Sequence, residues 1–497
     1  MKVLFKYCLG IALLMVSGLW LSTASAMPSY PRQTGMDCNS CHIGFENVPD
    51  FTRVGRLFIM RGFQQPNSVG GKLREDGFDA NGNDTPTYGG NYLALNWQDY
   101  LSARFISSFA SGGVASAVGG GGAKQDVTSN PGSRLCLFFT GPVTDWLGVW
   151  DEIGYLGNNS LKAANSTTTA GQSPGQPTNL NFFAYDEYRL TASKMLSDGY
   201  SFIAFAVGNE YPDAINEFVF PANQIRPWSY GQGGTGTEYS TQNMSWYGFF
   251  DNHYYAQYSL ISGDADASFS NGHNNYVALS YNGIPGTGDN YNRESDDVWW
   301  LFDAVWGNNV GSMVNSTTTS FDCTGTGTCP AGVASLGFSN SLGSNWGSIS
   351  DLSKVNGTGK ETVDTSHAWR LRVDQAAADD GNFSWYQGVA YACANQSYVS
   401  GAKASHCKLG YQNRWYYNRT WGFDLAVNRD MSFTYTTSAG VEMDVGKVTA
   451  WSIEFLYSPA MNIDVGLTYS PSKSNYILPA DVATGGYSYS LLIDYAF

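Results

Sequence analysis

Apolar and polar residues alternate along this chain from about residue 91 to its last residue. The final segment shows the pattern best, because every second position from Tyr487 to Phe497 is aromatic or aliphatic and the positions between are mostly polar. Successive side chains of a β-strand point to opposite faces of its sheet, so this pattern predicts strands that each have one apolar face. The segments 451–457 and 461–469 repeat the pattern.

Short connections alternate with long polar ones between these predicted strands. Tight turns are expected at Gly141–Asp145, Leu196–Gly199, Asn428–Asp430 and Ser458–Ala460, and long loops at 157–178, 212–240, 307–362 and 470–486. This asymmetry is typical of transmembrane barrels, whose short turns lie in the periplasm and whose long loops lie outside. The aromatic Phe497 at the end of the last strand is similar to the terminal signal of bacterial outer-membrane barrels.

These features predict an all-β fold, a transmembrane outer-membrane β-barrel of roughly sixteen antiparallel strands over residues 91–497. Closure is expected because lipid hydrocarbon offers no partner to an unpaired amide at a strand edge. The outward apolar face would contact outer-membrane lipid. A soluble propeller or sandwich is the alternative, but it explains neither Phe497 nor the alternation of short turns with long loops.

The composition agrees with a chain of many strands and polar loops. Charged residues make up 14% of the chain, against roughly 25% in typical soluble domains. Aromatic residues reach 15%, and there are 57 glycines. The formal net charge is -15, which argues against nucleic acid as a partner because phosphate binding requires clustered lysine and arginine.

The N-terminal region lacks the alternation of apolar and polar residues that marks the rest of the chain. Lys2 and Lys6 precede an apolar run at 11–21, and Ala24–Ala26 forms a small-residue cleavage site, so we expect a signal peptide at 1–26. Residues 27–65 form a compact unit, and residues 66–90 are a linker rich in Gly, Asn and Asp. No later stretch holds eighteen consecutive apolar residues.

The compact unit contains the motif Cys38-Asn39-Ser40-Cys41-His42. Two cysteines two residues apart, followed directly by histidine, are the attachment signature of a c-type haem. Cys38 and Cys41 would bind the porphyrin covalently, and His42 would be an axial ligand of the haem iron. The alternative is a Cys38–Cys41 redox disulfide beside an incidental His42, but that pattern usually lies in a thioredoxin-like βαβ unit, which is absent from this sequence.

The segments on both sides of the motif resemble a known family. Arg32-Gln33-Thr34-Gly35-Met36 precedes it, and the residues that follow in the same pattern are Pro49, Phe51, Thr52, Gly55, Arg56, Phe58, Gly62 and Phe63. About forty residues in this region resemble the fused monohaem cytochrome–porins of iron-oxidising bacteria, the outer-membrane iron oxidase family. The rest of the chain resembles that family in architecture only.

The resemblance implies a small cytochrome domain, here 27–65, that plugs the barrel to which it is fused. It implies that extracellular Fe(II) is the electron donor and that a periplasmic cytochrome or copper protein is the acceptor. Two alternatives remain open: a diffusion porin gated by its haem domain, and the same conduit with a sulfur compound or an extracellular shuttle as donor.

The sixth ligand of the haem iron is the least determined part of this prediction. Met60 is the first candidate, since a thioether opposite histidine raises the reduction potential and Fe(II) is a weak reductant. The alternative is that Met60 only packs against the porphyrin or the wall. Met36 is a weaker candidate, and His253, His273, His367 and His406 are expected to be loop or lumen residues.

Charged side chains suggest how the haem segment would be held. Arg32, Arg53, Arg56 and Arg61 are expected to pair with haem propionates or with carboxylates of the lumen. The alternation places four carboxylates on the face opposite the apolar one, and Arg370, Arg372 and Asp374 beside them; the four are Asp424, Glu454, Asp464 and Asp494.

The remaining cysteines divide into two pairs and a single residue. Cys323 with Cys329, and Cys393 with Cys407, could each form a disulfide in an oxidising compartment. Cys136 is expected to be an inert side chain packed in a strand.

Overall fold

The computed structural model describes residues 30, 41–44, 51–64, 100–116, 128–144, 146–156, 184–198, 201–209, 215, 242–251, 253–262, 273–283, 296–307, 319–322, 335–338, 363–378, 383–398, 401, 403–436, 440, 442–444, 448–460, 463–474 and 483–496. The expected signal peptide at 1–26 and the linker at 66–90 lie outside these ranges, and so do Arg32, Cys38, Cys323, Cys329 and Phe497.

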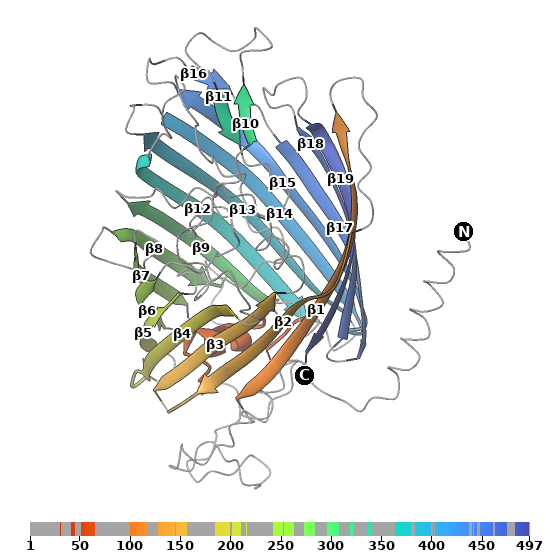
Figure 1. Ribbon diagram of the computed structural model, residues 1–497. Helices are drawn as coiled ribbons and strands as arrows, with labels where there is room; N and C mark the ends of the chain where they lie inside the picture. The colour runs from red at the N-terminus through yellow and green to blue at the C-terminus, as the bar shows by residue number, and fades with distance from the viewer. Residues whose placement is uncertain are drawn as a thin grey trace.

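Long antiparallel strands make up most of the described chain and close into a barrel (Figure 1). The wall strands are β1 (Leu101–Ser116), β2 (Thr128–Pro142), β3 (Leu147–Leu156), β4 (Ala184–Met195), β5 (Phe202–Gly208), β6 (Asn243–Phe250), β7 (Tyr254–Ser262), β8 (His273–Asn282), β9 (Asp296–Gly307), β12 (Val363–Ala378), β13 (Phe383–Tyr398), β14 (Lys403–Tyr417), β15 (Trp421–Thr436), β17 (Val448–Ala460), β18 (Ile463–Ser474) and β19 (Ala483–Ala496). Each pairs with its neighbours along the chain, β9 pairs with β12, and β1 pairs with β19 to complete the circle.

The predicted barrel of roughly sixteen antiparallel strands is therefore confirmed. A further short strand of the same sheet, β16 (Glu442–Asp444), pairs with the end of β15. Two other short strands, β10 (Thr319–Asp322) and β11 (Ser335–Phe338), form a separate hairpin inside the long segment 307–362. In the described part of the chain, no helix is long and apolar enough to cross a membrane.

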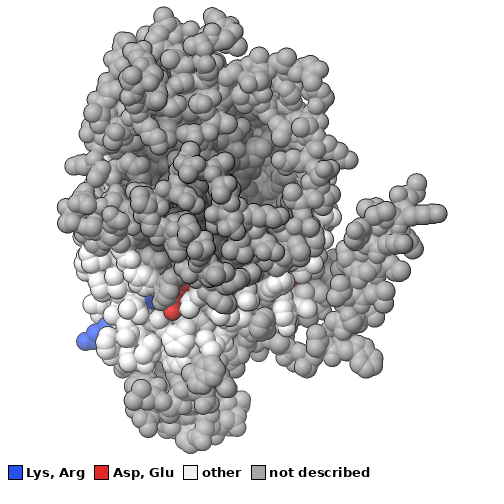
Figure 2. Space-filling view, viewed as in Figure 1, with Lys and Arg blue, Asp and Glu red and all other residues white. Residues whose placement is uncertain are grey.

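The two faces of the wall differ as the alternation predicts. Phe455 and Leu467 are 59% and 53% exposed on the outside, whereas Asp464 and Asp494 are buried in the interior. The described surface in Figure 2 is mostly uncharged. Exposed aromatic residues gather near the short turns, where aromatic girdles of outer-membrane barrels mark the membrane boundary; they include Trp146, Tyr254, Phe383, Tyr417 and Trp421.

Two predicted turns agree with the strand ends, and one was wrong. The connections after β2 and after β4 coincide with the turns expected at 141–145 and 196–199. The expected turn at Asn428–Asp430 lies inside β15 instead, where Asn428 pairs with Gly410 of β14 and Ala450 of β17. Asp430 faces the polar lumen, so asparagine and aspartate are tolerated in mid-strand here and do not mark a turn.

The actual turn between β14 and β15 lies at residues 418–420. Asn418 and Arg419 both have positive φ, 48° and 50°, which is the backbone conformation of tight hairpin turns. The turn predicted at Ser458–Ala460 lies slightly later in the chain, because β17 continues to Ala460 and β18 begins at Ile463. In this chain, a cluster of polar residues is therefore a weak signal for the position of a turn.

Buried ion pairs line part of the lumen. Arg370 Nε donates to Asp303 at 3.1 Å, and Arg414 Nε donates to Asp424 at 3.0 Å. Arg372 pairs with Asp374, two residues along β12, with Nε to Oδ1 at 2.8 Å. The prediction that Arg370, Arg372 and Asp374 face the lumen is confirmed, and their printed ion pairs are formed within the wall. Removal of one partner of a buried pair is costly because an uncompensated charge stays behind.

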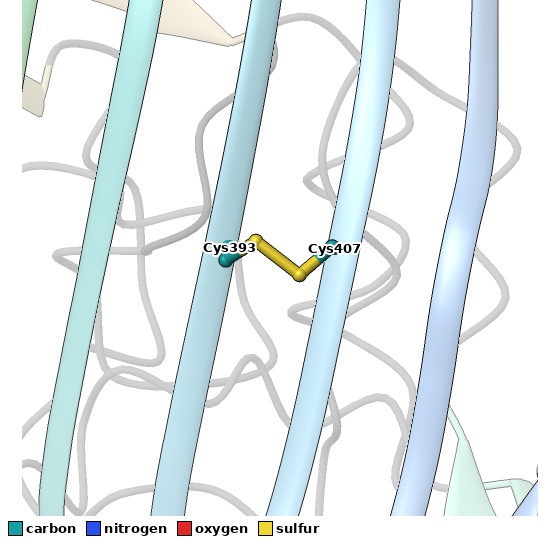
Figure 3. The surroundings of a disulfide bond; sticks show 2 residues. All are labelled: Cys393 and Cys407. Carbon is teal, nitrogen blue, oxygen red and sulfur yellow. A yellow bond between two sulfur atoms is a disulfide. The ribbon is translucent and has the colours of Figure 1, made fainter.

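One expected disulfide is present and joins two neighbouring strands. Cys393 of β13 lies directly opposite Cys407 of β14 in the strand register, with their Cα atoms 4.1 Å apart (Figure 3). The bond therefore links positions that the hydrogen-bonded ladder already holds together. Cys136 is buried within β2, as expected.

Candidate functional site

Two described stretches of the N-terminal unit lie against the interior of the wall, and we call residues 41–44 and 51–64 the plug segment. Its helix, α3 (Arg53–Met60), is seen behind β3 and β4 at the short-turn end of the barrel (Figure 1). Nearly all of the helix is buried, including the apolar residues Val54, Leu57 and Phe58. The described residues of the plug segment therefore pack against the barrel wall.

The start of α3 is tied directly to the cysteine–histidine pair. The Thr52 hydroxyl caps the helix by accepting from the Gly55 amide at 3.2 Å. The Thr52 amide in turn donates to the carbonyl of Cys41 at 2.9 Å, and His42 forms an isolated antiparallel bridge with Phe51. A Cβ at Gly55 would lie 2.4 Å from the Cys41 carbonyl oxygen, so glycine permits this close approach.

Cys41 and His42 present two different donor groups from consecutive residues. The Cys41 thiol takes part in no disulfide. Burial raises its pKa to about 12, which keeps the thiol neutral. The ring of His42 packs against Phe51 with the ring centroids 4.9 Å apart. A thiol and an imidazole at this spacing are the donors that a covalently attached haem requires from the second half of its motif.

Met60 lies at the opposite end of α3 from His42. The helix spans eight residues, which at 1.5 Å per residue is a rise of about 12 Å. The Met60 side chain is completely buried, and its carbonyl accepts a hydrogen bond from Tyr247 at 2.6 Å. Burial suits an iron ligand and a packing side chain equally, so the assignment of the sixth ligand stays a prediction.

Polar side chains of the wall hold the backbone of the plug segment. Ser193 donates to the carbonyl of Arg61 at 2.9 Å, and Ser384 donates to the carbonyl of Ile43 at 2.7 Å. In one contact the donor belongs to the plug segment instead, because the side-chain amide of Gln64 donates to the carbonyl of Thr144 at 2.7 Å. These bonds satisfy buried backbone groups that no sheet or helix pairs. Sequence reasoning missed Ser193, Ser384 and Tyr247, whose only signal was a polar residue at a lumen-facing position.

Arginine side chains form cation–π contacts with aromatic rings where the plug segment meets the wall. The guanidinium of Arg53 lies 5.9 Å from the centroid of the Phe249 ring, and that of Arg56 lies 5.1 Å from the Trp299 ring. The arrangement is reciprocal, because Arg189 of the wall lies 5.5 Å from the ring of Phe63. Cation–π contacts of desolvated arginines, as at Arg56 and Arg189, are worth about 2 kcal/mol each, and contacts of more exposed arginines such as Arg53 are worth less.

The expected pairing of Asp494 and Glu454 with the arginines of the plug segment was wrong. Asp494 pairs with Arg104 of the neighbouring strand, with Nε to Oδ1 at 2.9 Å. Glu454 accepts from Thr468 at 3.1 Å. The physical reason is register, because adjacent strands bring these groups together at short range, and the plug segment meets other parts of the wall.

Arg53 contacts an amide side chain of the wall. Its guanidinium donates to the amide oxygen of Asn282 at 2.7 Å. The backbone carbonyl oxygen of Asn282 is also in hydrogen-bonding contact with Nδ1 of His253, at 2.6 Å. This part of the contact lies at the turn between β6 and β7, on the short-turn side of the barrel.

The other histidines are distributed around the wall. His253 lies at the turn before β7 and stacks on Tyr281 with the ring centroids 5.4 Å apart. His273 and His406 belong to β8 and β14. His367 is exposed within β12, so it occupies neither a loop nor the lumen as expected. In the ranges that the structure describes, no group of three or more His, Cys, Asp or Glu side chains is arranged to hold a metal ion.

The backbone of the plug segment comes closest to the wall at two glycines. A Cβ at Gly148 of β3 would lie 1.7 Å from the carbonyl oxygen of Gly62, and a Cβ at Gly62 would lie 2.7 Å from Thr191. Gly62 also has a φ of 68°, a conformation that glycine adopts without strain. The turn after α3 therefore fits the wall only because both positions are glycine.

Comparisons with known proteins describe the barrel alone. No protein-family model matches the chain, and no curated protein matches it. Among solved structures, OprB of Pseudomonas putida has a TM-score of 0.46 at 10% identity, covering 83% of this chain and 98% of that one. OmpT of Vibrio cholerae has a TM-score of 0.44 at 8% identity, covering 80% and 96%. The anion-selective porin of Comamonas acidovorans has a TM-score of 0.41 at 10% identity, covering 80% and 99%.

Gly148→Ala should displace the plug segment from the wall. The added methyl group collides with backbone that cannot rotate away, and overpacking of this kind costs about 1–3 kcal/mol. Trypsin should then cleave at Arg53, Arg56 and Arg61 roughly tenfold faster than in the wild type, since cleavage follows the population of the open form. Limited proteolysis of the detergent-solubilised barrel measures this rate.

The matched control is Val149→Ala, at the neighbouring outward-facing position of β3. It places alanine at the next position of the same strand without touching the plug segment, and it should leave the cleavage rate unchanged. Equal protease resistance of Gly148→Ala and the wild type would show that the plug segment does not depend on this contact.

Proposed function

We propose that this protein is an outer-membrane c-type cytochrome that takes electrons from extracellular Fe(II) and passes them to a periplasmic carrier. The observation that supports the proposal is that Cys41 and His42, the described half of a Cys-x-x-Cys-His sequence, lie on a segment that packs against the wall of a closed barrel. The resemblance of the flanking residues to the outer-membrane iron oxidase family supplies the donor.

The described half of the motif suits the cofactor. Cys41 has the free thiol that a thioether bond requires, and His42 follows it directly. A c-type haem supplies reversible one-electron chemistry when bound. The residues of this chain would attach it through Cys38 and Cys41, ligate its iron through His42, and keep it in the lumen by the contacts that hold the plug segment.

The location within the barrel supports a role in electron transfer across the membrane. The apolar band of an outer-membrane barrel is about 25 Å tall and separates an extracellular donor from a periplasmic acceptor. A redox group held in the lumen divides that distance into shorter steps. Each Fe(II) ion would give up one electron and leave as Fe(III) on the outside, and the electron would leave toward the short-turn, periplasmic side.

Stopped-flow mixing of the oxidised, detergent-solubilised protein with Fe(II) tests the proposal. We expect the haem absorption to convert to that of the reduced form, with one Fe(II) consumed per haem. Cys41→Ser should lower the covalently bound haem on a denaturing gel several-fold, because one of the two attachment bonds is lost. Cys136→Ser, a buried cysteine of β2 outside the motif, is the control and should keep full haem content.

Absence of any reduction by Fe(II) over a wide pH range would remove iron as the donor. The same instrument then distinguishes the donor alternative, because sulfide or a soluble electron shuttle would reduce the haem where Fe(II) does not. Wild-type haem content in Cys41→Ser would remove the attachment itself.

Met60→Ala should abolish a methionine–iron charge-transfer band and lower the reduction potential if Met60 is the sixth ligand, since its thioether favours the ferrous state. Absorption spectra and a redox titration measure both quantities. Met431→Ala, on the exposed face of β15, should change neither. An unchanged spectrum and potential in Met60→Ala would leave Met60 with a packing role only.

A diffusion porin gated by its haem domain is the second candidate. It is favoured by the closed barrel, which resembles outer-membrane porins in fold. Single-channel recording in lipid bilayers separates the two, because a barrel closed by its plug segment should conduct poorly. A large, steady conductance in the wild type, alongside slow reduction by Fe(II), would favour the porin.

A further inference from the structure

We propose that the outward face of β12, β13 and β14 is a contact surface between two copies of this chain in the outer membrane. The inference is carried by a row of amide side chains on a face that is apolar above and below it. Gln375 pairs with Gln387 in the strand register, and Gln387 pairs with Asn413; we call these three residues the amide row. The inference needs no haem, so it goes beyond the proposed function.

The amide row faces away from the lumen. Along β13, Gln387 is half-buried, whereas Tyr386 next to it is buried and turns its hydroxyl to Asp374, to which it donates at 3.1 Å. Successive side chains of a strand point to opposite faces, so Gln387 lies on the outer face. Its neighbours on that face along β13 are Trp385 and Val389, and the amide row is therefore flanked by apolar side chains.

The amide row lies at the depth of the lipid hydrocarbon. Phe383 begins β13 and belongs to the exposed aromatic residues near the short turns, which mark the membrane boundary. Gln387 is four residues further along, and such a stretch of tilted strand rises about 10 Å. This position is inside an apolar band about 25 Å tall, where hydrocarbon supplies no hydrogen-bond partner.

Hydrogen bonds within the amide row use only part of its capacity. Gln387 Nε2 donates to Gln375 Oε1 at 3.1 Å, and Asn413 Nδ2 donates to the hydroxyl of Tyr411 at 2.7 Å. A glutamine side chain has two N–H donors and one carbonyl acceptor. Among the residues that the structure describes, the amide nitrogen of Gln375 and the side-chain oxygen of Gln387 make no hydrogen bond. Unpaired amides are costly in hydrocarbon, which favours contact with a protein surface.

A second copy of the chain suits these groups because they are complementary to themselves. Across a two-fold axis, Gln375 of each copy can donate to Gln387 of the other, which is the reciprocal pairing of an isologous dimer. The amide row has no charge that would select a charged partner. The connections at both ends of β13, 379–382 and 399–402, are short, so two barrels can approach each other along this strand.

The disulfide lies on the same face of the same strands. Cys393 and Cys407 follow Gln387 and Asn413 at even spacing along β13 and β14, so their side chains point to the same side. The bond ties the two strands together beyond their hydrogen bonds (Figure 3). A surface that is already rigid loses little freedom on association, which favours a specific contact here.

Cysteine cross-linking in isolated outer membranes tests the contact. Gln387→Cys places a thiol at the centre of the amide row, and mild oxidation should give a band of twice the monomer mass on a non-reducing gel. Leu190→Cys is the matched control, because Leu190 is 42% exposed on β4, on the other side of the ring. This control and the wild type, which has its own cysteines, should both stay monomeric.

Replacement of the two glutamines by leucine tests the hydrogen bonds. Leucine is favoured by lipid, so the double variant Gln375→Leu, Gln387→Leu should still form a barrel, as circular dichroism would show. One hydrogen bond between membrane segments changes an association constant about threefold, so loss of two reciprocal bonds should weaken the dimer roughly tenfold. Native mass spectrometry in detergent measures the dimer fraction. Asn275→Leu removes an outward amide of β8 that accepts from Tyr258 and should leave the dimer unchanged.

Three results would overturn the inference. One is a folded Gln387→Cys barrel that stays monomeric on oxidation. Another is a cross-linked band of a different mass, which would identify another protein as the occupant of this face. The third is a lipid that stays bound to the monomer in the mass spectrum and is lost in the double leucine variant. Each of these leaves the proposed function intact, because haem attachment and reduction by Fe(II) are measured separately.

Discussion

The closed ladder of backbone hydrogen bonds is the constraint on which the rest of this structure depends. Lipid offers no partner to an unpaired amide, so the described wall strands pair on both edges and the last, β19, returns to the first. Closure turns the period-two alternation into an inside and an outside. Phe455 and Leu467 face outward, and charged residues such as Asp303 and Arg370 are buried in the lumen. The lumen is thus a polar interior, and the buried ion pairs of the described strands lie there.

The described contacts between the plug segment and the wall include hydroxyl groups, amides and aromatic rings. The strand register already joins Asp494 to Arg104 and Asp424 to Arg414. Ser193, Ser384 and Tyr247 hold the plug backbone by single hydrogen bonds, and aromatic faces hold Arg53 and Arg56. Such contacts fix the position of the plug segment against the wall, and a fixed position is what the proposed electron-transfer role requires.

Close backbone approaches are required at both ends of α3. Cys41 and His42 have to approach the start of α3, and Gly55 allows this because any side chain would strike the Cys41 carbonyl. The turn after the helix has to approach β3, and Gly62 with Gly148 allows that approach. The two ends of the helix are therefore set by separate close contacts, one within the plug segment and one with the wall.

The amino-acid sequence by itself determined the fold class, the number of strands to a close approximation, the lumen-facing positions of Arg370, Arg372 and Asp374, and the chemistry expected of Cys41 and His42. These follow from periodicity and spacing, which are local properties. Only the tertiary structure decided which carboxylate meets which arginine, that Asn428 and Asp430 lie in a strand, and that Trp299 receives Arg56. Those contacts depend on strand register and on closure of the barrel around the plug segment. Closure brings together residues that are hundreds of positions apart in the sequence, such as Arg104 and Asp494. A local sequence pattern does not predict such contacts.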